Sequence, residues 1–285
     1  ALLNHQPMGF YRPEVVVHDA QRHGIRVLPV DVNVSDATCR VEDGAVRLGF
    51  CYVKELGERM MQTIVAERRL RPYESLEDFC SRLELQGSVV ENLILAGAFQ
   101  FCGGRRRELL WRLGVAEKRA PGELPLDTAG AQVPLREMTP LEEMRCDYSV
   151  QQMSTTHHPM AVLREAMHDP DLARSADLPA LADGARVRIA GYVIMKQRPP
   201  TAKGFAFITM EDEDGAINIV IRPDIYEQYR QVCVFNPVLI IDGVLQKRDG
   251  TLNIVAQTIA PFRPDGERPV PARGRTRAAP PLPSH

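Results

Sequence analysis

The residues best suited to chemistry lie in one segment of the 285-residue chain, Arg198 to Asn218. Arg198 and Lys203 come first, and Phe205 and Phe207 follow them. Cations attract phosphates and flat aromatic rings stack on bases, so this order is typical of a surface that binds single-stranded nucleic acid. The alternative is an ordinary β-hairpin in which both phenylalanines lie in the core and the charges are only solvated. These residues alone leave both interpretations open.

The same segment has the pattern of a strand, a turn and a second strand. Residues 205–211 alternate with the period of two that directs one set of side chains to a core and the other to solvent. Asp214-Gly215 is expected to close a tight hairpin, because glycine tolerates the positive φ that such turns require. Residues 216–221 then form the next strand. We expect the acidic residues Glu211 to Asp214 to shape this turn.

Catalysis has no comparable support in the sequence. Two-metal phosphoryl transfer needs carboxylates that converge from rigid strands, but the acids of 211–214 lie in a turn and Asp169 and Asp171 flank a proline. His157 and His158 are adjacent, so they point to different faces, and a helix-breaking turn is a better interpretation than a metal site. The sequence contains no G-x-S-x-G, P-loop or H-E-x-x-H motif. We therefore assign no catalytic residue, no metal ligand and no cofactor to this chain.

A second candidate for nucleic-acid contact is Val53 to Arg59, which is shaped like the hairpin of a helix-hairpin-helix element. Such a hairpin directs backbone N–H groups and a helix N-terminus at a phosphate, independently of base sequence. The usual hairpin has glycine on both sides of its apolar residue, whereas Glu55 takes the first of these positions here. Its Cβ and its charge both weaken phosphate contact, so a purely structural turn stays an equal alternative. Arg105 to Arg107 could also clamp phosphates, but a solvated helix start is favoured.

The elements that position these residues divide the chain into a helical and a β part. Residues 1–115 have the pattern of short, mostly helical elements, with Gly24 ending one helix and Ser75 and Ser88 capping two others. Residues 120–135 are rich in Pro, Gly and Ala and indicate a linker, and helix resumes over 140–167 with a break at His157 to Pro159. Five strands and one helix then follow in the order of an OB-type barrel: 186–196, 205–211, 216–221, the helix 223–232, 237–245 and 251–259. The expected fold class is α+β.

Composition excludes several classes of protein. The formal net charge is −2, with the acids concentrated in residues 120–184, so charge neither excludes nor strongly favours nucleic-acid binding by the flanking parts. The six cysteines never approach C-x-x-C spacing, which is typical of reduced thiols in a cytoplasmic protein and indicates neither a zinc site nor a disulfide framework. No segment has the pattern of a signal peptide or a membrane span. Because residue 1 is not Met and the chain opens in what looks like mid-domain sequence, we expect a fragment of a longer protein.

Seven motifs together resemble the C-terminal portion of bacterial C-family replicative DNA polymerases, the DnaE-type alpha subunit of polymerase III. They occur in the family's order: LLNHQPMGFY, DAQRHGIRVLPVDVN, RLGFCYVKELGE, SLEDFCSR, LILAGAF, HPMAVLR and RPPTAKGFAFITMEDEDGAIN. Their sequences are most similar to those of the error-prone, damage-inducible branch (ImuC). The resemblance covers the chain except for the linker and the tail.

The resemblance implies the DNA-binding part of an error-prone, translesion polymerase that acts in DNA synthesis and repair. It implies five regions: 1–33 as the end of the polymerase fingers, 34–119 as the duplex-binding helix-hairpin-helix region, 120–184 as linker and connecting helices, 185–262 as the OB-fold near single-stranded template, and 263–285 as a disordered tail. The residues that match the family's binding motifs are Lys54, Gly57, Glu58 and Arg59 in the hairpin and Arg198, Lys203, Phe205 and Phe207 in the OB-fold.

The partners that the resemblance implies are duplex and single-stranded DNA, translesion accessory proteins and a sliding clamp. In replicative relatives a clamp-binding peptide lies between the helical region and the OB-fold, where Glu123 to Asp127 lacks the usual Gln and terminal aromatic. The palm carboxylates and their Mg²⁺ are expected upstream of Ala1. Two alternatives stay open: the anticodon-binding OB domain of an aminoacyl-tRNA synthetase, which should continue into a class II catalytic domain, and a module that binds accessory proteins.

Overall fold

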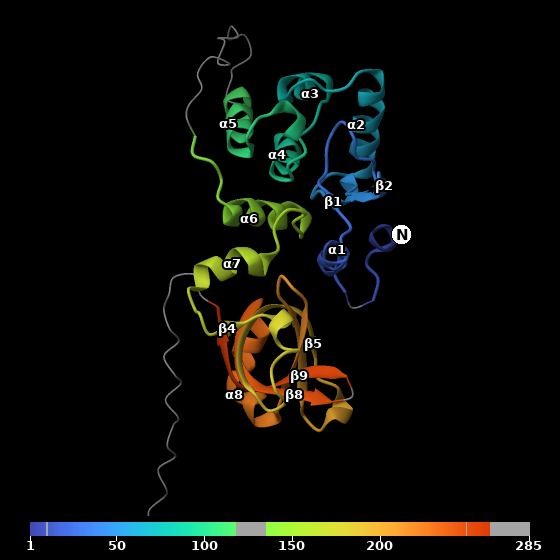
Figure 1. The fold of residues 1–285 in the computed structure, drawn as a ribbon. Coiled ribbons are helices and arrows are strands. Elements are labelled where there is room, and N and C mark those ends of the chain that lie inside the picture. Colours follow the sequence, from blue (N-terminus) through green and yellow to red (C-terminus); the bar gives the residue numbers. More distant parts are fainter. Residues whose placement is uncertain (10, 118–134, 249, 263–285) are drawn as a thin grey trace, which may run out of the picture.

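The computed structural model describes residues 1–9, 11–117, 135–248 and 250–262. Figure 1 shows a helical part at one end of the molecule and a β-barrel at the other. Three helices lie between them: α1 (Pro13–Arg22), α6 (Pro140–Gln151) and α7 (Pro159–Met167). A helical region followed by a barrel confirms the α+β fold class expected from the sequence.

Short helices around a small sheet build the helical part. The helices are α2 (Glu58–Leu70), α3 (Leu76–Arg82), α4 (Gly87–Leu95) and α5 (Arg106–Glu117), and the strands are β1 (Val27–Leu28), β2 (Arg40–Glu42) and β3 (Ala45–Arg47) in the order β1-β3-β2. Aromatic side chains fill the core. Phe79 packs edge-on against both Tyr73 and Phe99, with ring centroids 4.8 and 5.1 Å apart, an arrangement that aromatic pairs prefer.

Local signals in the sequence set most helix ends. Pro13 begins α1, where a missing N–H leaves no hydrogen bond unmade. Gly24, with a φ of +77°, follows the end of α1 as expected. The Ser75 hydroxyl accepts a hydrogen bond from the Asp78 N–H, which confirms the predicted cap of α3. The predicted break between α6 and α7 is also present, with His158 as the N-cap residue of α7.

One local prediction is wrong, and one strand was not predicted. Ser88 does not cap α4, because the Gln86 carbonyl already accepts the Val90 N–H and Ser88 lies inside the first turn. The strand β2 was not expected, since Arg40–Glu42 carries charged residues and gains its strand conformation only by pairing antiparallel with β3. The strand β2 therefore depends on hydrogen bonds that a neighbouring segment supplies.

The barrel has the strand order and closure of an OB-fold. Its elements are β5 (Arg186–Gln197), β6 (Ala206–Glu211), β7 (Ala216–Ile221), α8 (Pro223–Phe235), β8 (Val238–Arg248) and β9 (Thr251–Pro261). Neighbouring strands follow the order β5-β6-β7-β9-β8, and β8 pairs back with β5 to close the cylinder. A two-residue strand, β4 (Leu172–Ala173), adds to β5 in parallel. All five predicted strands and the predicted helix are confirmed.

Gly191 lies at the corner where β5 changes partners. β5 pairs with β8 as far as Tyr192 and with β6 from Tyr192 onward. A Cβ atom on Gly191 would lie 2.8 Å from the Cβ of Met210 and 3.2 Å from the Glu211 carbonyl oxygen, closer than packed atoms normally approach. The missing side chain therefore lets β5 and β6 come together at this corner.

The predicted alternation along β6 is confirmed. Ala206, Ile208 and Met210 are at most 3% exposed and face the barrel core, whereas Phe207 is 37% exposed. Phe207 is therefore not a core residue, and the interpretation that buries both phenylalanines is wrong for this one.

The turn between β6 and β7 differs from the tight glycine turn that was predicted. Gly215 does not adopt a positive φ. Residues 212–215 form the connection instead, and the Asp212 carboxylate accepts the backbone N–H groups of Asp214 and Gly215, both at 3.0 Å. The turn is thus set by a buried carboxylate that bonds to its own backbone, as Asp commonly does in turns.

Some predictions lie outside the described residues. These are most of the linker, the clamp-like peptide at 123–127 and the tail beyond residue 262. Within the residues that the structure does describe, no helix is long and apolar enough to cross a membrane.

Candidate nucleic-acid interface

The first candidate surface is the outer face of the barrel around β6. Phe207 projects outward from β6, between its cross-strand neighbours Gln197 on β5 and Val220 on β7. Phe205 lies half-buried just before β6 begins. Of the two rings, Phe207 therefore offers the larger exposed surface to a stacking base.

The loop between β5 and β6 carries the two predicted cations. The Arg198 guanidinium lies 4.7 Å from the ring centroid of Tyr226 and 3.1 Å from the Glu227 carboxylate, both on α8. Lys203 is exposed in a left-handed conformation (φ +49°) immediately before Gly204, and it forms no ion pair with any described residue. Lys203 is therefore the cation most available to a phosphate, whereas Arg198 would first have to leave Glu227.

These residues share the side of the barrel that OB-folds use for ligands. In such barrels the second and third strands and the loop between the first and second strands bind oligonucleotides. The second strand is β6, which carries Phe207, and the loop is residues 198–205, which carries the other three. The structure thus places Arg198, Lys203 and Phe205 in one loop and Phe207 on the strand that follows it.

The second candidate surface is the turn that leads into α2. Val53 and Leu56 are buried and anchor the turn, whereas Lys54 and Arg59 are exposed. Gly57 is the N-cap residue of α2, and no described side chain caps this helix. The first N–H groups of α2 are therefore left for another acceptor, and such a helix N-terminus is suited to a phosphate.

Glu55 is the unusual residue of this turn. Its φ of +64° lies in the left-handed region that favours glycine, the residue found there in the usual hairpin. Its carboxylate lies 3.9 Å from the ammonium of Lys54. Glu58, the first residue of α2, is also exposed and acidic. These two acids offset part of the positive charge that Lys54 and Arg59 present.

The two candidate surfaces do not form one site. Figure 1 shows α2 in the helical part and the strands β5 to β9 in the barrel, at opposite ends of the molecule. The structure therefore places the predicted residues in two groups, 54–59 and 198–207, that would contact different stretches of a nucleic acid.

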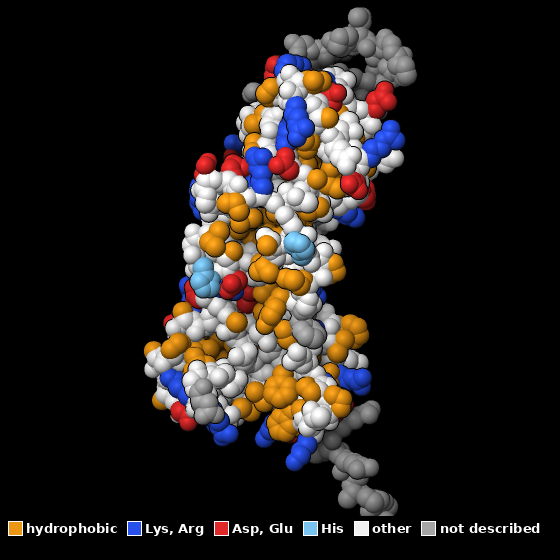
Figure 2. All heavy atoms as spheres, turned by 90° about the vertical axis from the view of Figure 1, so that its right-hand side faces the viewer, with side chains coloured by type: hydrophobic (Ala, Val, Ile, Leu, Met, Phe, Trp, Pro, Cys, Tyr) orange, Lys and Arg blue, Asp and Glu red, His pale blue; other side chains and the backbone are white. Residues whose placement is uncertain are grey.

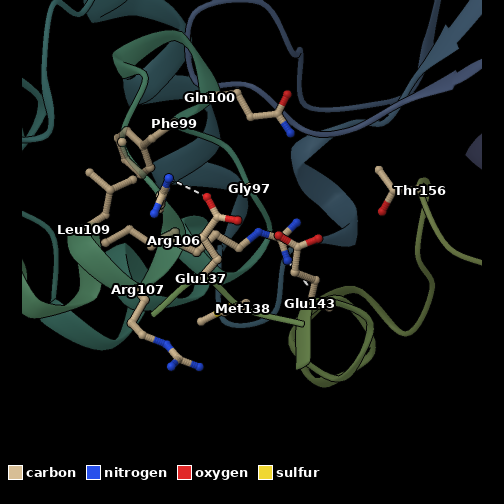
Figure 3. A pocket seen from close by; sticks show the side chains of 13 residues that line it. Gly97, Phe99, Gln100, Arg106, Arg107, Leu109, Glu137, Met138, Glu143 and Thr156 are labelled. Carbon is tan, nitrogen blue, oxygen red and sulfur yellow. Dashed lines mark hydrogen bonds and ion pairs between the residues drawn. The ribbon is translucent and has the colours of Figure 1, made fainter. Parts of the chain in front are cut away.

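The arginine run at the start of α5 is not a free phosphate clamp. Each arginine forms an ion pair with an acid: Arg105 with Glu137, Arg106 with Asp147 at 2.7 Å, and Arg107 with Glu142 at 3.1 Å. Figure 3 shows several of these side chains around the pocket between α5 and the segment that leads into α6. The run fastens α5 to α6, so it is also not the solvated helix start that the sequence favoured.

A buried polar junction joins the barrel to α1 and α7, and no sequence pattern indicated it. Glu211, at the end of β6, is completely buried. Its Oε1 lies 2.6 Å from His18 Nδ1 and its Oε2 lies 3.3 Å from Arg22, both on α1. His158, at the start of α7, places Nε2 3.7 Å from the same Oε1. Because a carboxylate can only accept, Nδ1 of His18 carries the proton of that hydrogen bond.

The electrostatics of this junction keep Glu211 ionised. Burial by itself would raise the pKa of this carboxyl, but the neighbouring His158 and His18 outweigh burial and lower its pKa to about 2. Glu14, which is buried nearby on α1, behaves in the opposite way, because burial dominates and raises its pKa. Glu211 is therefore negatively charged at neutral pH, and it is surrounded by His18 and Arg22 of α1 and by His158 at the start of α7.

His18, His158 and Glu211 also have the donor types of a metal site, with ligand atoms within 4.8 Å of one another. The hydrogen bonds argue against that use. His158 Nδ1 accepts the Met160 N–H at 3.1 Å, so in the neutral ring the proton lies on Nε2, the nitrogen that faces Glu211. A metal at Nε2 would have to displace that proton while Nδ1 is held as an acceptor. The cluster fits a hydrogen-bonded junction better than a metal centre.

The neighbouring acids of the same turn bind further parts of the chain. Asp212 accepts hydrogen bonds from the backbone N–H and the hydroxyl of Ser175, at 2.7 and 2.5 Å. Glu213 pairs with Arg164 of α7 at 2.5 Å and lies 3.6 Å from Arg174. Asp212 therefore shapes the turn, as predicted, whereas Glu213 holds the barrel to α7. Their carboxylates are already engaged and fit no pair of metal ions.

Charge on the surface is dispersed. Figure 2 shows Lys and Arg side chains scattered over the displayed face among hydrophobic and acidic ones, without one large basic patch. Nucleic-acid binding on this face would therefore depend on a few placed cations and rings more than on a strong general field.

Comparisons with known families agree with the geometry. Residues 24–109 match the family described as a helix-hairpin-helix motif, and residues 187–262 match the family described as an OB-fold nucleic acid binding domain. The chain thus has a helix-hairpin-helix region followed by an OB-fold of a nucleic-acid-binding family.

Relatives then identify the family. The chain is 37% identical over 92% of its length to the error-prone DNA polymerase of Corynebacterium glutamicum, 38% over 93% to that of Corynebacterium efficiens, and 34% over 90% to that of Rhodopirellula baltica. It covers 23 to 24% of those proteins, about a quarter of their length. The chain is homologous to a C-terminal part of bacterial error-prone DNA polymerases, which confirms the resemblance of its motifs.

A likeness to a solved structure is much weaker. The asparaginyl-tRNA synthetase of Pyrococcus horikoshii is 18% identical over 32% of this chain and 22% of that chain, with a TM-score of 0.28. This similarity carries no argument about function.

Proposed function

We propose that this chain holds DNA for an error-prone, translesion polymerase. The turn before α2 would contact the backbone of the primer-template duplex, and the outer face of the barrel around β6 would contact single-stranded template. The observation that carries the proposal is the exposure of Lys203 and Phe207 on the ligand side of an OB barrel. A phosphate and a stacked base need such a cation and such a ring.

The contact with duplex rests on the start of α2. The uncapped N–H groups of the first turn, together with Lys54 and Arg59, can bind a phosphate without reading the base sequence. Glu55 and Glu58 lie beside them and reduce the attraction. We therefore expect this contact to be weak and sensitive to salt.

We assign nucleotide transfer, together with its Mg²⁺, to the three quarters of the error-prone polymerases that this chain does not cover. The described acids with the most suitable positions, Glu211 and Asp212, are already bonded to His18 and Ser175. Binding of a sliding clamp or of accessory proteins belongs to the same proposal. The peptide at 123–127 that would serve a clamp lies outside the described residues.

Fluorescence anisotropy with labelled single-stranded and duplex oligonucleotides tests the barrel surface. Loss of one stacked base costs roughly 1 to 3 kcal/mol, so Lys203→Ala with Phe207→Ala should weaken single-strand binding by roughly tenfold or more. Duplex binding should not change. The matched control is Arg230→Ala with Phe235→Ala, an exposed cation and an exposed ring on α8.

The same assay tests the turn before α2. Arg59→Ala should weaken duplex binding and flatten its dependence on salt, because one cation fewer releases fewer counterions. Arg69→Ala is the control, since it removes an exposed arginine from the opposite end of α2. Binding that does not respond to salt, or equal effects of all four variants, would contradict the proposal and favour a module for accessory proteins.

A further inference from the structure

Cys39 and Cys51 belong to two segments that lie against each other below the turn before α2. Gly49 packs directly on the earlier segment, since a Cβ there would lie 2.3 Å from the Thr38 carbonyl carbon. Two backbone hydrogen bonds continue the contact: Phe50 N–H to the Asp36 carbonyl and Cys51 N–H to the Ala37 carbonyl, both at 2.9 Å. The chain therefore doubles back so that residues 36–39 run beside residues 49–51.

The position of Cys39 is fixed by its neighbours. The Asn4 side chain donates to the Cys39 carbonyl at 2.8 Å and accepts the Cys39 N–H at 2.9 Å. The Gly49 N–H donates to the Cys39 sulfur at 3.4 Å. Such a donor stabilises a thiolate more than a thiol. Cys39 is half-buried against the core of the helical part, whereas Cys51 is exposed.

The two thiols also act on each other. The neighbouring Cys51 thiol lowers the pKa of Cys39 to about 7 despite burial, and the same interaction raises the pKa of Cys51. A lowered pKa favours the thiolate of Cys39, which is the nucleophilic form. Burial instead raises the pKa of three other thiols: Cys102, Cys146 and Cys233.

We propose that Cys39 and Cys51 form a redox-active pair that closes to a disulfide on exposure to hydrogen peroxide. The Cys39 thiolate attacks one peroxide oxygen, the O–O bond breaks, and the departing hydroxide takes up a proton to become water. The sulfenic acid formed on Cys39 is then attacked by the Cys51 sulfur. The S–S bond forms as the S–O bond breaks, and the hydroxide that leaves takes the Cys51 proton as a second water. Peroxide is reduced and the two thiols are oxidised.

The bond would lie at the base of the candidate duplex contact. Cys51 belongs to the short 3-10 helix Phe50–Tyr52, directly before the turn at 53–59. Oxidation would tie this helix to the segment before β2. The modification does not depend on DNA binding, so its test and the tests of the proposed function can fail separately.

Peptide mapping tests the proposal on the 285-residue chain. After treatment with hydrogen peroxide and alkylation of the remaining thiols, trypsin should release peptide 27–40 joined to peptide 48–54, and dithiothreitol should separate them. Cys80→Ser, which removes another exposed thiol, should leave the joined pair intact. Cys51→Ser should abolish it. Failure to find the joined pair under peroxide that oxidises Cys80, or joining of Cys39 to Cys80 in equal amount, would overturn the proposal.

A second measurement does not require the disulfide to form. The rate at which iodoacetamide alkylates Cys39 should reach half its maximum near neutral pH, and in Cys51→Ala, which keeps neither a thiol nor a hydroxyl donor at this position, this midpoint should move to higher pH. Circular dichroism of the variant checks that the exposed substitution leaves the fold unchanged. An unchanged midpoint would show that Cys51 does not activate Cys39 and would also overturn the proposal.

Discussion

The two ends of the β6–β7 hairpin hold charged residues in opposite environments, one buried and the other exposed. At the turn end, Glu211 and Asp212 are completely buried, and histidine, arginine and serine side chains surround their carboxylates. At the loop end, Lys203 is exposed and forms no ion pair with the described residues, and Phe207, four residues further along the chain, is also exposed. One hairpin thus provides both an internal fastening and an external surface.

The difference follows from the cost of removing a charge from water. A buried carboxylate is tolerated only where partners replace its hydration, so its contacts are part of the fold. An exposed cation keeps its water until a ligand takes its place. Acids and cations that are neighbours in sequence can therefore belong to stability and to binding, respectively.

The largest expected effect comes from removing a partner at the buried end. Glu211→Ala leaves His18 and Arg22 without the carboxylate that they bond to. Loss of one member of a buried ion pair lowers the free energy of unfolding by about 3 kcal/mol or more. We expect the free energy of unfolding in urea, followed by circular dichroism, to fall by that amount. Asp214→Ala, at the exposed position of the same turn, should change it by less than about 0.5 kcal/mol. Equal losses from the two variants would erase the distinction between the ends.

Acid should lower the free energy of unfolding by less than Glu211→Ala does, because protonation removes the charge of Glu211 but keeps its side chain. The pKa of Glu211 is lowered from 4.5 to about 2 in the folded chain, so the unfolded chain takes up the proton first as pH falls. The contribution of Glu211 is complete above pH 4.5 and is lost between pH 4.5 and about 2. Unfolding measured across this window should show a shallower slope in Glu211→Gln. A parallel curve in that variant would mean that other groups carry the acid sensitivity.

At the exposed end the expected effect concerns binding and not stability. Phe207→Ala alone should weaken single-strand binding by roughly 1 to 3 kcal/mol, the cost of one lost stacking contact. Its free energy of unfolding should stay within about 0.5 kcal/mol of the parent chain. Titration of labelled oligonucleotide and urea unfolding give the two values. A large loss of stability with unchanged binding would place Phe207 with the buried residues instead.

The smallest expected effect is at Glu55. A glycine fits the left-handed conformation without the steric cost that glutamate bears, so Glu55→Gly should stabilise the chain by about 0.5 to 1 kcal/mol. Loss of the carboxylate beside Lys54 should also tighten duplex binding slightly. Asp43→Gly, at another position with a positive φ, controls for the backbone effect without changing the turn before α2. If both variants changed duplex binding equally, Glu55 would have no special place in that contact.

The fold was largely predictable because its signals are local. The period of two along 205–211, the Ser75 cap and the proline after His158 each act within a few residues, and each gave the observed element. The barrel followed from the order of such elements. The alternation alone did not show which set of side chains faces the core, and only the structure shows that Ala206 and Ile208 do and that Phe207 is exposed.

The junction could not be predicted in this way. His18 and Glu211 are 193 positions apart, and nothing near either residue indicates the other. The arginines at 105–107 were misjudged for a similar reason, because Asp147 and Glu142 approach Arg106 and Arg107 only once α5 and α6 have taken their places in the fold. Pairs of this kind depend on how helices and strands pack against one another, and no local sequence pattern predicts that packing.

Gly191 links two properties that otherwise look unrelated. It lies against Met210 and the Glu211 carbonyl at the corner where the cylinder closes, while the side chain of Glu211 fastens the barrel to α1. A methyl group at this position would press on β6 and move the residue that sets how the barrel is held against the helical part. Closure of the barrel and its attachment to α1 therefore both depend on the absence of a side chain at Gly191.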